Sequence, residues 1–201
     1  MSTQDLKKTL KTLYNPPSAD FVELVVPPRT FVKVDGEGDP NTAVEYKTAV
    51  EWLYPVSYAM KFASKALDRD YVVPPLEALW WADDPKSFVT RDKAAWKWTV
   101  MLPVPDFVST SMFDTAVAKT MTKRTDKPAT LRFEPFDEGR CLQIMHIGSY
   151  DDEGPTLARL HDEIMPTRGL TFNGAHHEIY LSDPRKTEPA RLKTILRQPV
   201  R

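Results

Sequence analysis

The segment HHEIYLSDP, residues 176–184, is the stretch on which the fold prediction depends. Within it, Ile179 and Leu181 alternate with Glu178 and Tyr180, and this period of two is typical of a β-strand with one buried face. We expect Ile179 and Leu181 to pack against helices that cover the sheet. On that expectation, Glu178 and Tyr180 lie on the other face of the strand, where they line a groove.

The elements just upstream of this strand predict a small unit of mixed helix and strand. Residues 130–136 and 140–147 are rich in strand-forming side chains, and we predict that they pair as a hairpin. Residues 155–165 have apolar positions at helical spacing, behind a proline that suits a first helical turn. The chain after residue 190 carries four basic residues, which we interpret as a solvated tail.

The first half of the chain has the same order of elements. Strand candidates precede a helix at residues 43–67, where Pro55 predicts a kink or a break, and further strands follow at 76–82 and 94–102. The sequence therefore predicts an α+β fold of duplicated β-α-β-β repeats with pseudo-two-fold symmetry, antiparallel sheets backed by helices, and a ligand cleft between the repeats. The predicted boundaries are an N-terminal arm at 1–20 and a single domain at 21–201, divided into repeat one (about 21–105), a connecting helix (about 106–125) and repeat two (about 126–201).

Composition narrows the class of protein. The chain has 201 residues, 27 Lys and Arg against 28 Asp and Glu, and 41% hydrophobic residues, which excludes a disordered chain. A formal net charge of −1 gives no electrostatic reason to expect nucleic acid or a membrane as a partner. A single cysteine, Cys141, and the lack of a secretory leader favour a reducing compartment, so we expect a cytoplasmic protein. We expect Cys141 to be a buried strand residue rather than a nucleophile. The oligomeric state is left open.

Two glutamates are candidates for proton transfer. Glu178 is predicted to face an apolar groove, where loss of hydration favours a carboxylate that can accept a proton near neutral pH. Glu77 begins the corresponding strand of repeat one, so it is the second candidate. The sequence does not decide which of the two is the base.

Aromatic residues concentrate in the strands of repeat one. Stacked indoles form flat slots for planar ligands, so we expect Trp81 and Trp98, together with Met101, to line a substrate-binding wall. Hydrogen-bond donors to a ligand could come from Tyr58, Tyr54 or His146. Tyr58 is our choice for a catalytic role beside Glu178.

Motifs for metals and cofactors are missing from the sequence. The four histidines have no metal-ligand spacing, and the adjacent pair His176 and His177 point to opposite faces of a strand. No Gly-rich nucleotide loop and no nucleophile elbow occurs. We therefore expect neither a metal nor a cofactor.

The segments PLEALWW (residues 75–81) and HHEIYLSDPRKT (176–187), with the chain end at 192–197, resemble the stand-alone GyrI-like small-molecule-binding proteins. The resemblance covers nearly the whole chain. It implies duplicated β-α-β-β units, a flat aromatic ligand and a functional strand glutamate at Glu178. Stand-alone members of this kind hydrolyse the cyclopropane of spirocyclopropyl-cyclohexadienone DNA-alkylating antibiotics, a detoxification that confers resistance.

Two functions follow from this resemblance. The first is a hydrolase that opens the cyclopropane with water and needs no cofactor. The alternative is a non-catalytic protein that binds, sequesters or senses drugs, as the effector-binding halves of multidrug-responsive regulators do. No DNA-binding helix-turn-helix is evident in the sequence.

Overall fold

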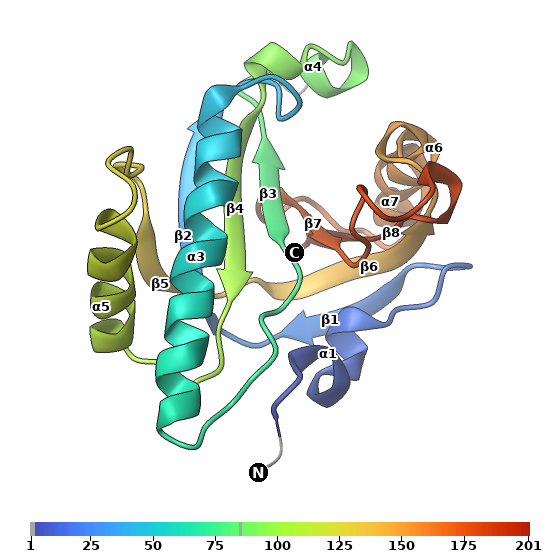
Figure 1. Ribbon diagram of the computed structural model, residues 1–201. Helices are drawn as coiled ribbons and strands as arrows, with labels where there is room; N and C mark the ends of the chain where they lie inside the picture. Colours follow the sequence, from blue (N-terminus) through green and yellow to red (C-terminus); the bar gives the residue numbers. More distant parts are fainter. Residues whose placement is uncertain (1–2, 85) are drawn as a thin grey trace. The chain divides into compact units, whose positions relative to one another are not determined.

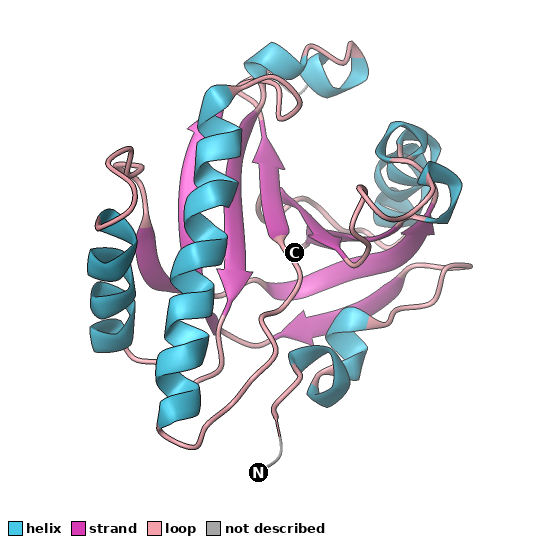
Figure 2. Cartoon of the chain, viewed as in Figure 1, coloured by secondary structure: helices cyan, strands magenta, loops and turns pink. Residues whose placement is uncertain are grey.

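The computed structural model describes residues 3–84 and 86–201 (Figure 1). Antiparallel strands and helices build an α+β fold (Figure 2). The chain divides into two compact units. Unit 1 contains the residues up to Thr9, Arg29–Pro74 and Ala78–Phe136, and unit 2 contains Leu10–Pro28, Pro75–Glu77 and Asp137–Arg201.

Unit 1 is a four-stranded sheet with two longer helices. Its strands have the order β3-β4-β2-β5, and β2 pairs antiparallel with both β4 and β5. The helix α3 packs against β2 and β4, where Trp98 and its neighbour across the strands, Gly36, contact each other. The elements are α1 (Leu6–Thr9), β2 (Arg29–Glu37), α3 (Val44–Ala66), β3 (Glu77–Trp81), α4 (Lys86–Val89), η1 (Lys93–Ala95), β4 (Lys97–Pro103), α5 (Thr110–Met121) and β5 (Arg132–Phe136).

Four strands of unit 2 pair antiparallel into a sheet, in the order β1-β6-β8-β7. Its helices bury an apolar core against one face of this sheet. The core contains Leu142 and Ile144 of β6, Leu196 of β8, and Leu160 and Met165 of the helices. The elements are α2 (Lys11–Tyr14), β1 (Val22–Val26), β6 (Gly139–Ile147), η2 (Tyr150–Asp152), α6 (Gly154–Ala158), the π-helical η3 (Arg159–Ile164), α7 (Met165–Thr167), β7 (His176–Tyr180), η4 (Pro189–Arg191) and β8 (Lys193–Pro199).

The two units confirm the predicted repeat. β2, α3, β3 and β4 follow one another in the first repeat, and β6, the α6–α7 helices, β7 and β8 do so in the second. In both, the last of the three strands lies between the first and the second. The duplicated β-α-β-β order that the sequence predicted is therefore present, with antiparallel sheets backed by helices.

The predicted hairpin between residues 130–136 and 140–147 is wrong. β5 pairs with β2 of unit 1, whereas β6 pairs with β1 and β8 of unit 2. Each repeat thus receives its edge strand from the segment that precedes the other repeat in the chain. Local strand propensity cannot reveal such an exchange, because it carries no information about the partner.

The basic chain end is also not a solvated tail. Residues 193–199 form β8, in which Ile195, Leu196 and Arg197 are buried. Likewise, the segment predicted as an arm is packed, since Leu6, Leu13 and Tyr14 are buried within their respective units. A buried arginine that is paired with a carboxylate looks the same in sequence as an exposed one, which explains the error for β8.

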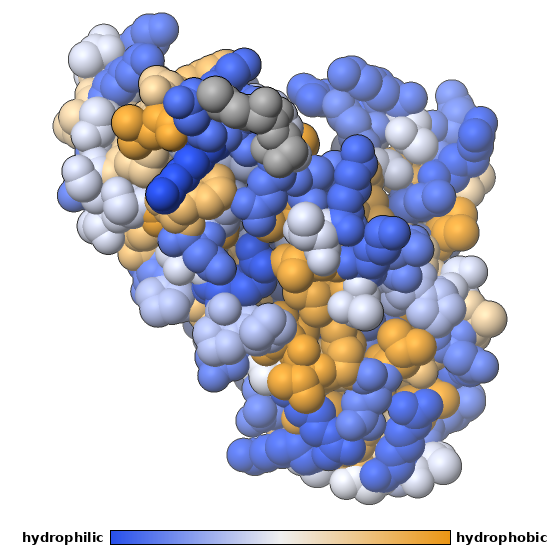
Figure 3. Space-filling model, turned by 90° about the horizontal axis from the view of Figure 1, so that it is seen from below, coloured by the Kyte–Doolittle hydropathy of each residue, from blue (hydrophilic) through white to orange (hydrophobic). Residues whose placement is uncertain are grey.

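The helix α3 runs through Pro55 without a break. Pro55 is exposed, while Trp52, Leu53 and Val56 around it are fully buried. Packing of these side chains compensates for the hydrogen bond that proline removes. None of the helices in the described residues is long and apolar enough to cross a membrane. The face drawn in Figure 3 is mostly hydrophilic, with hydrophobic side chains gathered in one area of it.

Candidate functional site

The strand β7 places Glu178 on the helix-covered face of the unit 2 sheet. Glu178 lies opposite Leu196 of β8, and Leu196 belongs to the core beneath the helices. The neighbouring residue Ile179 therefore points to the other face. The expectation that Ile179 faces the helices is wrong, because alternation fixes which residues share a face but does not say which face the helices cover.

The Glu178 carboxylate has two polar neighbours from its own strand. The Tyr180 hydroxyl donates a hydrogen bond of 2.7 Å to Oε2. Nε2 of His176 lies 3.5 Å from Oε1. The Glu178 side chain keeps 15% of its surface exposed, so it is largely desolvated yet still reachable. This combination suits a carboxylate that accepts a proton from a bound molecule.

Tyr150 adds an aromatic wall next to these groups. Its ring meets that of Tyr180 edge to face, with 5.6 Å between the ring centroids. Burial raises the pKa of Tyr150 to about 12, and the negative charges of Glu153 and Glu178 act in the same direction. The phenol therefore stays protonated at neutral pH and is available as a hydrogen-bond donor.

A fully buried network of charges occupies the opposite face of β7. Nδ1 of His177 lies 2.7 Å from Glu138 and its Nε2 lies 3.0 Å from Glu77. Arg197 of β8 pairs with Glu138 at 3.0 Å, and the Tyr14 hydroxyl donates to Glu77 at 2.9 Å. All of these groups belong to unit 2.

Neutral partners complete this network. Arg197 also donates to the Gln143 side chain at 3.0 Å and to the carbonyl oxygen of Leu13 at 2.9 Å. The Gln143 amide in turn donates to the carbonyl oxygen of Thr12 at 2.6 Å. The network therefore joins α2 to three strands of unit 2.

The charges in this network hold each other ionised. Burial lowers the pKa of His177, but the charges of Glu138 and Glu77 outweigh that effect and raise it to about 9. Burial raises the pKa of Glu138, and His177 with Arg197 reverse this and bring it to about 2. Two cations thus face two carboxylates, so the interior carries little net charge.

Glu77 is therefore not an open counterpart of Glu178. It is 2% exposed and engaged by Tyr14 and His177, which removes it from contact with a ligand. Because Glu77 lies at the start of β3, the sequence indicated that it corresponds to Glu178, and the structure shows that it does not. Glu77 lies on the face of the network, whereas Glu178 lies on the face of the helices.

In unit 1, the aromatic side chains form a closed stack under α3. The Tyr46 ring of α3 lies 6.1 Å from Trp80 and 5.0 Å from Trp98, centroid to centroid. Trp96 meets Trp80 at 5.8 Å. Trp98 is fully buried, and a Cβ atom built at Gly36 would come within 2.2 Å of its ring. Glycine is required there because the indole occupies the space above it.

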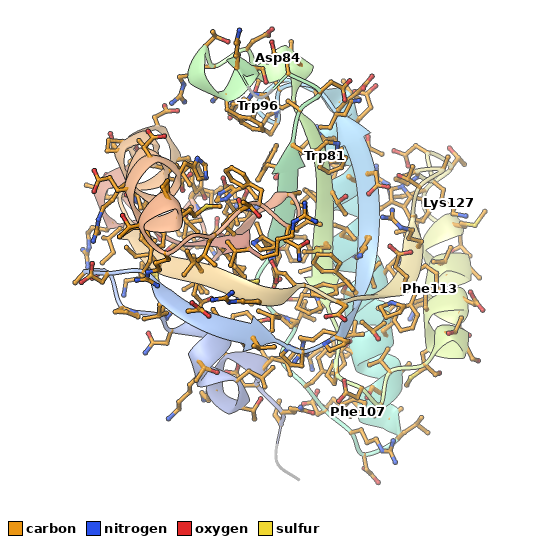
Figure 4. All side chains as sticks on the ribbon, turned by 180° about the vertical axis from the view of Figure 1, so that it is seen from behind. Trp81, Asp84, Trp96, Phe107, Phe113 and Lys127 are labelled. Carbon is orange, nitrogen blue, oxygen red and sulfur yellow. The ribbon has the colours of Figure 1, made fainter. Side chains whose placement is uncertain are left out.

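The predicted wall of Trp81, Trp98 and Met101 is not present as one surface. Trp98 and Met101 lie on opposite faces of β4, because they are three positions apart in the strand, and both are fully buried. Trp81 is partly exposed at the end of β3. Figure 4 shows Trp81 on its strand and Trp96 beside α4, where the Phe88 ring lies 5.1 Å from Trp96. The accessible aromatic surface of unit 1 therefore involves Trp96, which the sequence did not single out.

The other predicted donors have different surroundings. Tyr58 is 45% exposed on α3 and lies next to Phe62, while Tyr54 is partly exposed one turn earlier. His146 of β6 is 8% exposed, and its Nε2 lies 3.1 Å from the Ser149 carbonyl oxygen. Cys141 is fully buried as predicted, and burial raises the pKa of its thiol, which makes it a poor nucleophile.

Sequence reasoning missed the Glu138, His177 and Arg197 network. One signal for it was present, since His177 falls on the apolar face of an otherwise alternating strand and so needs a buried partner. Among the described residues, no group of three or more His, Cys, Asp or Glu side chains is arranged to hold a metal ion.

Comparison with known proteins supports a single family. Residues 20–201 match the family model described as GyrI-like small molecule binding domain. A crystal structure of a hydrolase from Listeria innocua is 39% identical, with a TM-score of 0.87 and complete coverage of both chains. An uncharacterized conserved protein from Listeria innocua is 40% identical, with a TM-score of 0.89 over 98% of this chain and 99% of that chain.

More distant similarity is limited to the fold. The EcmrR C-terminal domain has a TM-score of 0.57 at 13% identity, over 90% of this chain and 97% of that chain, and so shares the fold alone. No curated protein matches the chain.

Proposed function

The chain belongs to the GyrI-like small-molecule-binding family, and on this premise we propose that it is a hydrolase. The proposed substrates are flat aromatic molecules with a spirocyclopropyl-cyclohexadienone group, the class of DNA-alkylating antibiotics. The observation that carries the proposal is the half-buried Glu178 carboxylate beside Tyr180, Tyr150 and His176. Sequence identity of 39–40% over 98–100% of this chain to hydrolases from Listeria innocua supports hydrolysis as the reaction class.

The proposed reaction is the addition of one water molecule. Glu178 accepts a proton from water, whose oxygen forms a bond to a CH₂ carbon of the cyclopropane. The bond between that carbon and the spiro carbon breaks, and its electron pair moves through the dienone to its oxygen, giving a phenolate. A donor then protonates the phenolate and regains its own proton from solvent, while Glu178 releases to solvent the proton that it took from water. Because relief of ring strain and aromatisation drive the reaction, a single positioned base is sufficient to accelerate it.

The proposed reaction also uses a hydrogen-bond donor to the dienone oxygen. We assign this role to Tyr58, which is 45% exposed, and hydrogen bonds to a developing oxyanion lower the barrier by several kcal/mol when preorganised. Trp81 and Tyr54 remain proposed contacts to the flat part of the ligand. His146 is a weaker candidate, because the Ser149 carbonyl already engages its ring.

Mass spectrometry of the product tests this function. The purified protein is incubated with a spirocyclopropyl-cyclohexadienone compound in water and, in parallel, in ¹⁸O-labelled water. We expect a product that has gained one water and that carries ¹⁸O in the second experiment. Quenching of tryptophan fluorescence by the compound without any hydrated product would instead favour the non-catalytic binding protein.

A further inference from the structure

Three histidines in unit 2 have buried ring nitrogens that lack hydrogen-bond partners. Among the described residues, these atoms are Nδ1 and Nε2 of His176, Nε2 of His161 and Nε2 of His177, and the last of these still has the Glu77 carboxylate as an ionic neighbour at 3.0 Å. Buried polar atoms are nearly always paired in native proteins, so an unpaired group near a functional residue calls for an explanation. The His176 side chain is 14% exposed and lies on the same face of β7 as Glu178.

The helical segment that carries His161 has an unusual backbone. Residues Arg159–Ile164 form a π-helical turn, which carries His161. Turns of this type are rare and occur frequently at functional sites. The His161 ring packs on Phe172 with centroids 5.0 Å apart, and burial, together with the nearby His176, lowers its pKa. The π-helical turn is independent support for a functional region on this face of β7.

The adjacent histidines of β7 occupy two different environments. His177 is fully buried and engaged by Glu77 and Glu138 on one face. His176, on the other face, is left with Glu178 as its charged neighbour on β7, at 3.5 Å between Nε2 and Oε1. This distance is longer than a good hydrogen bond, and such contacts in unliganded sites often shorten when a ligand binds.

We propose that His176 is a positioning residue for Glu178. Nε2–H of the neutral ring donates to Oε1, while the Tyr180 hydroxyl donates to Oε2. The carboxylate is thereby held at both oxygens, and its remaining lone pairs are directed at the water that it deprotonates. This role rests on the proposed hydrolysis, and it gives His176 a function that neither the family match nor the similar structures assign.

The test compares two substitutions of His176, by Asn and by Gln, whose side-chain amides differ in length. The Gln side-chain nitrogen can occupy the place of Nε2, whereas the shorter Asn amide mimics only Nδ1. We expect His176→Asn to lower kcat by ~10-fold or more with KM changed by less than about threefold, since only positioning is lost. His176→Gln should recover most of the rate. The control is Asp162→Asn, which changes an exposed side chain on the neighbouring π-helical turn and should retain the wild-type rate.

Two outcomes would overturn the proposal. Equal losses in His176→Asn and His176→Gln indicate a structural role for the ring, and full activity in both variants indicates no role. A separate measurement needs no substrate: the ¹⁵N chemical shifts of the His176 ring should change in Glu178→Gln and stay unchanged in Glu163→Gln.

The spectroscopic measurement separates the two proposals. If the wild-type protein yields no hydrated product, the proposed function fails. The ring shifts then still decide whether His176 is coupled to Glu178, and unchanged shifts refute the coupling.

Discussion

The two repeats use the same scaffold in opposite ways on the face that their helices cover. In the first repeat, Tyr46, Trp80 and Trp98 fill this face with a closed aromatic stack. In the second repeat, the corresponding face keeps Glu178 and Tyr180 half-buried on the second strand, β7. Duplication of a fold therefore permits one copy to be packed for stability while the other retains polar groups that chemistry requires.

The opposite face of the unit 2 sheet differs from the face that carries Glu178. In unit 2, the face opposite the helices holds the network of His177, Glu138 and Arg197, where every charge is paired. The difference teaches that the number of charged residues does not identify a functional site. A functional carboxylate is instead recognised by being accessible and by lacking a full set of charged partners, and Glu178 meets both conditions.

The largest effect on activity is expected when the Glu178 charge is removed. We expect Glu178→Gln to lower the hydrolysis rate by ~10²–10⁴-fold, the usual contribution of a general base, with unchanged folding. The rate of formation of the hydrated product measures it, with the exposed Glu188→Gln as control. Full turnover in Glu178→Gln would place the chemistry elsewhere.

Removing a charge from the buried network should affect stability instead. Arg197→Met leaves Glu138 with one cation fewer in a buried site, so we expect a loss of about 3–5 kcal/mol in the free energy of unfolding. Urea unfolding followed by circular dichroism measures the loss. Arg191→Met, at an exposed position, serves as control and should stay within about 0.5 kcal/mol of wild type.

The same network predicts a pH dependence of stability. The pKa of His177 is about 9 in the folded protein against about 6.5 in an unfolded chain, so the folded state holds its proton longer as pH rises. The stabilisation is complete below about pH 6.5 and is lost as pH increases through 9, by about 3 kcal/mol in total. Unfolding curves between pH 6 and pH 10 should show the decline in wild type, and His177→Gln should lack it.

Tyr58 tests whether chemistry is confined to the second repeat. Tyr58 is the proposed donor from unit 1. We expect Tyr58→Phe to lower the rate of hydrolysis by ~10²-fold, because one hydrogen bond to the developing oxyanion is lost. Steady-state kinetics with the same substrate measure this change. If Tyr58→Phe retains its full rate, the first repeat provides no donor at this position.

The smallest effect concerns the aromatic stack. Gly36→Ala forces a methyl group against Trp98, so we expect a loss of about 1–3 kcal/mol in stability. The control is Gly154→Ala, where nothing lies within 4 Å of the added atom and the free energy of unfolding should stay equal or rise slightly. Equal stability of the two variants would mean that the stack is looser than described.

The sequence predicted the repeat and the strand of Glu178, but not the partners of most strands. Alternation placed Glu178 and Tyr180 together correctly, since it depends only on local geometry. It could not show that β5 and β1 exchange partners, or that Arg197 is buried against Glu138. These features depend on contacts between distant segments, for which a single sequence holds no direct signal.

The exchange of edge strands has a consequence for synthesis of the chain. Val22 of β1 pairs with Gln143 of β6, so β1 has no partner strand until β6 has been made. At ~5–20 residues per second, a ribosome needs roughly 6–24 s to make the intervening chain. During this interval the apolar segment Val22–Val26 is an unpaired strand that can aggregate. The edge of β1 is therefore exposed for longer during synthesis than the edge of a strand that pairs in a hairpin with its neighbour in the chain.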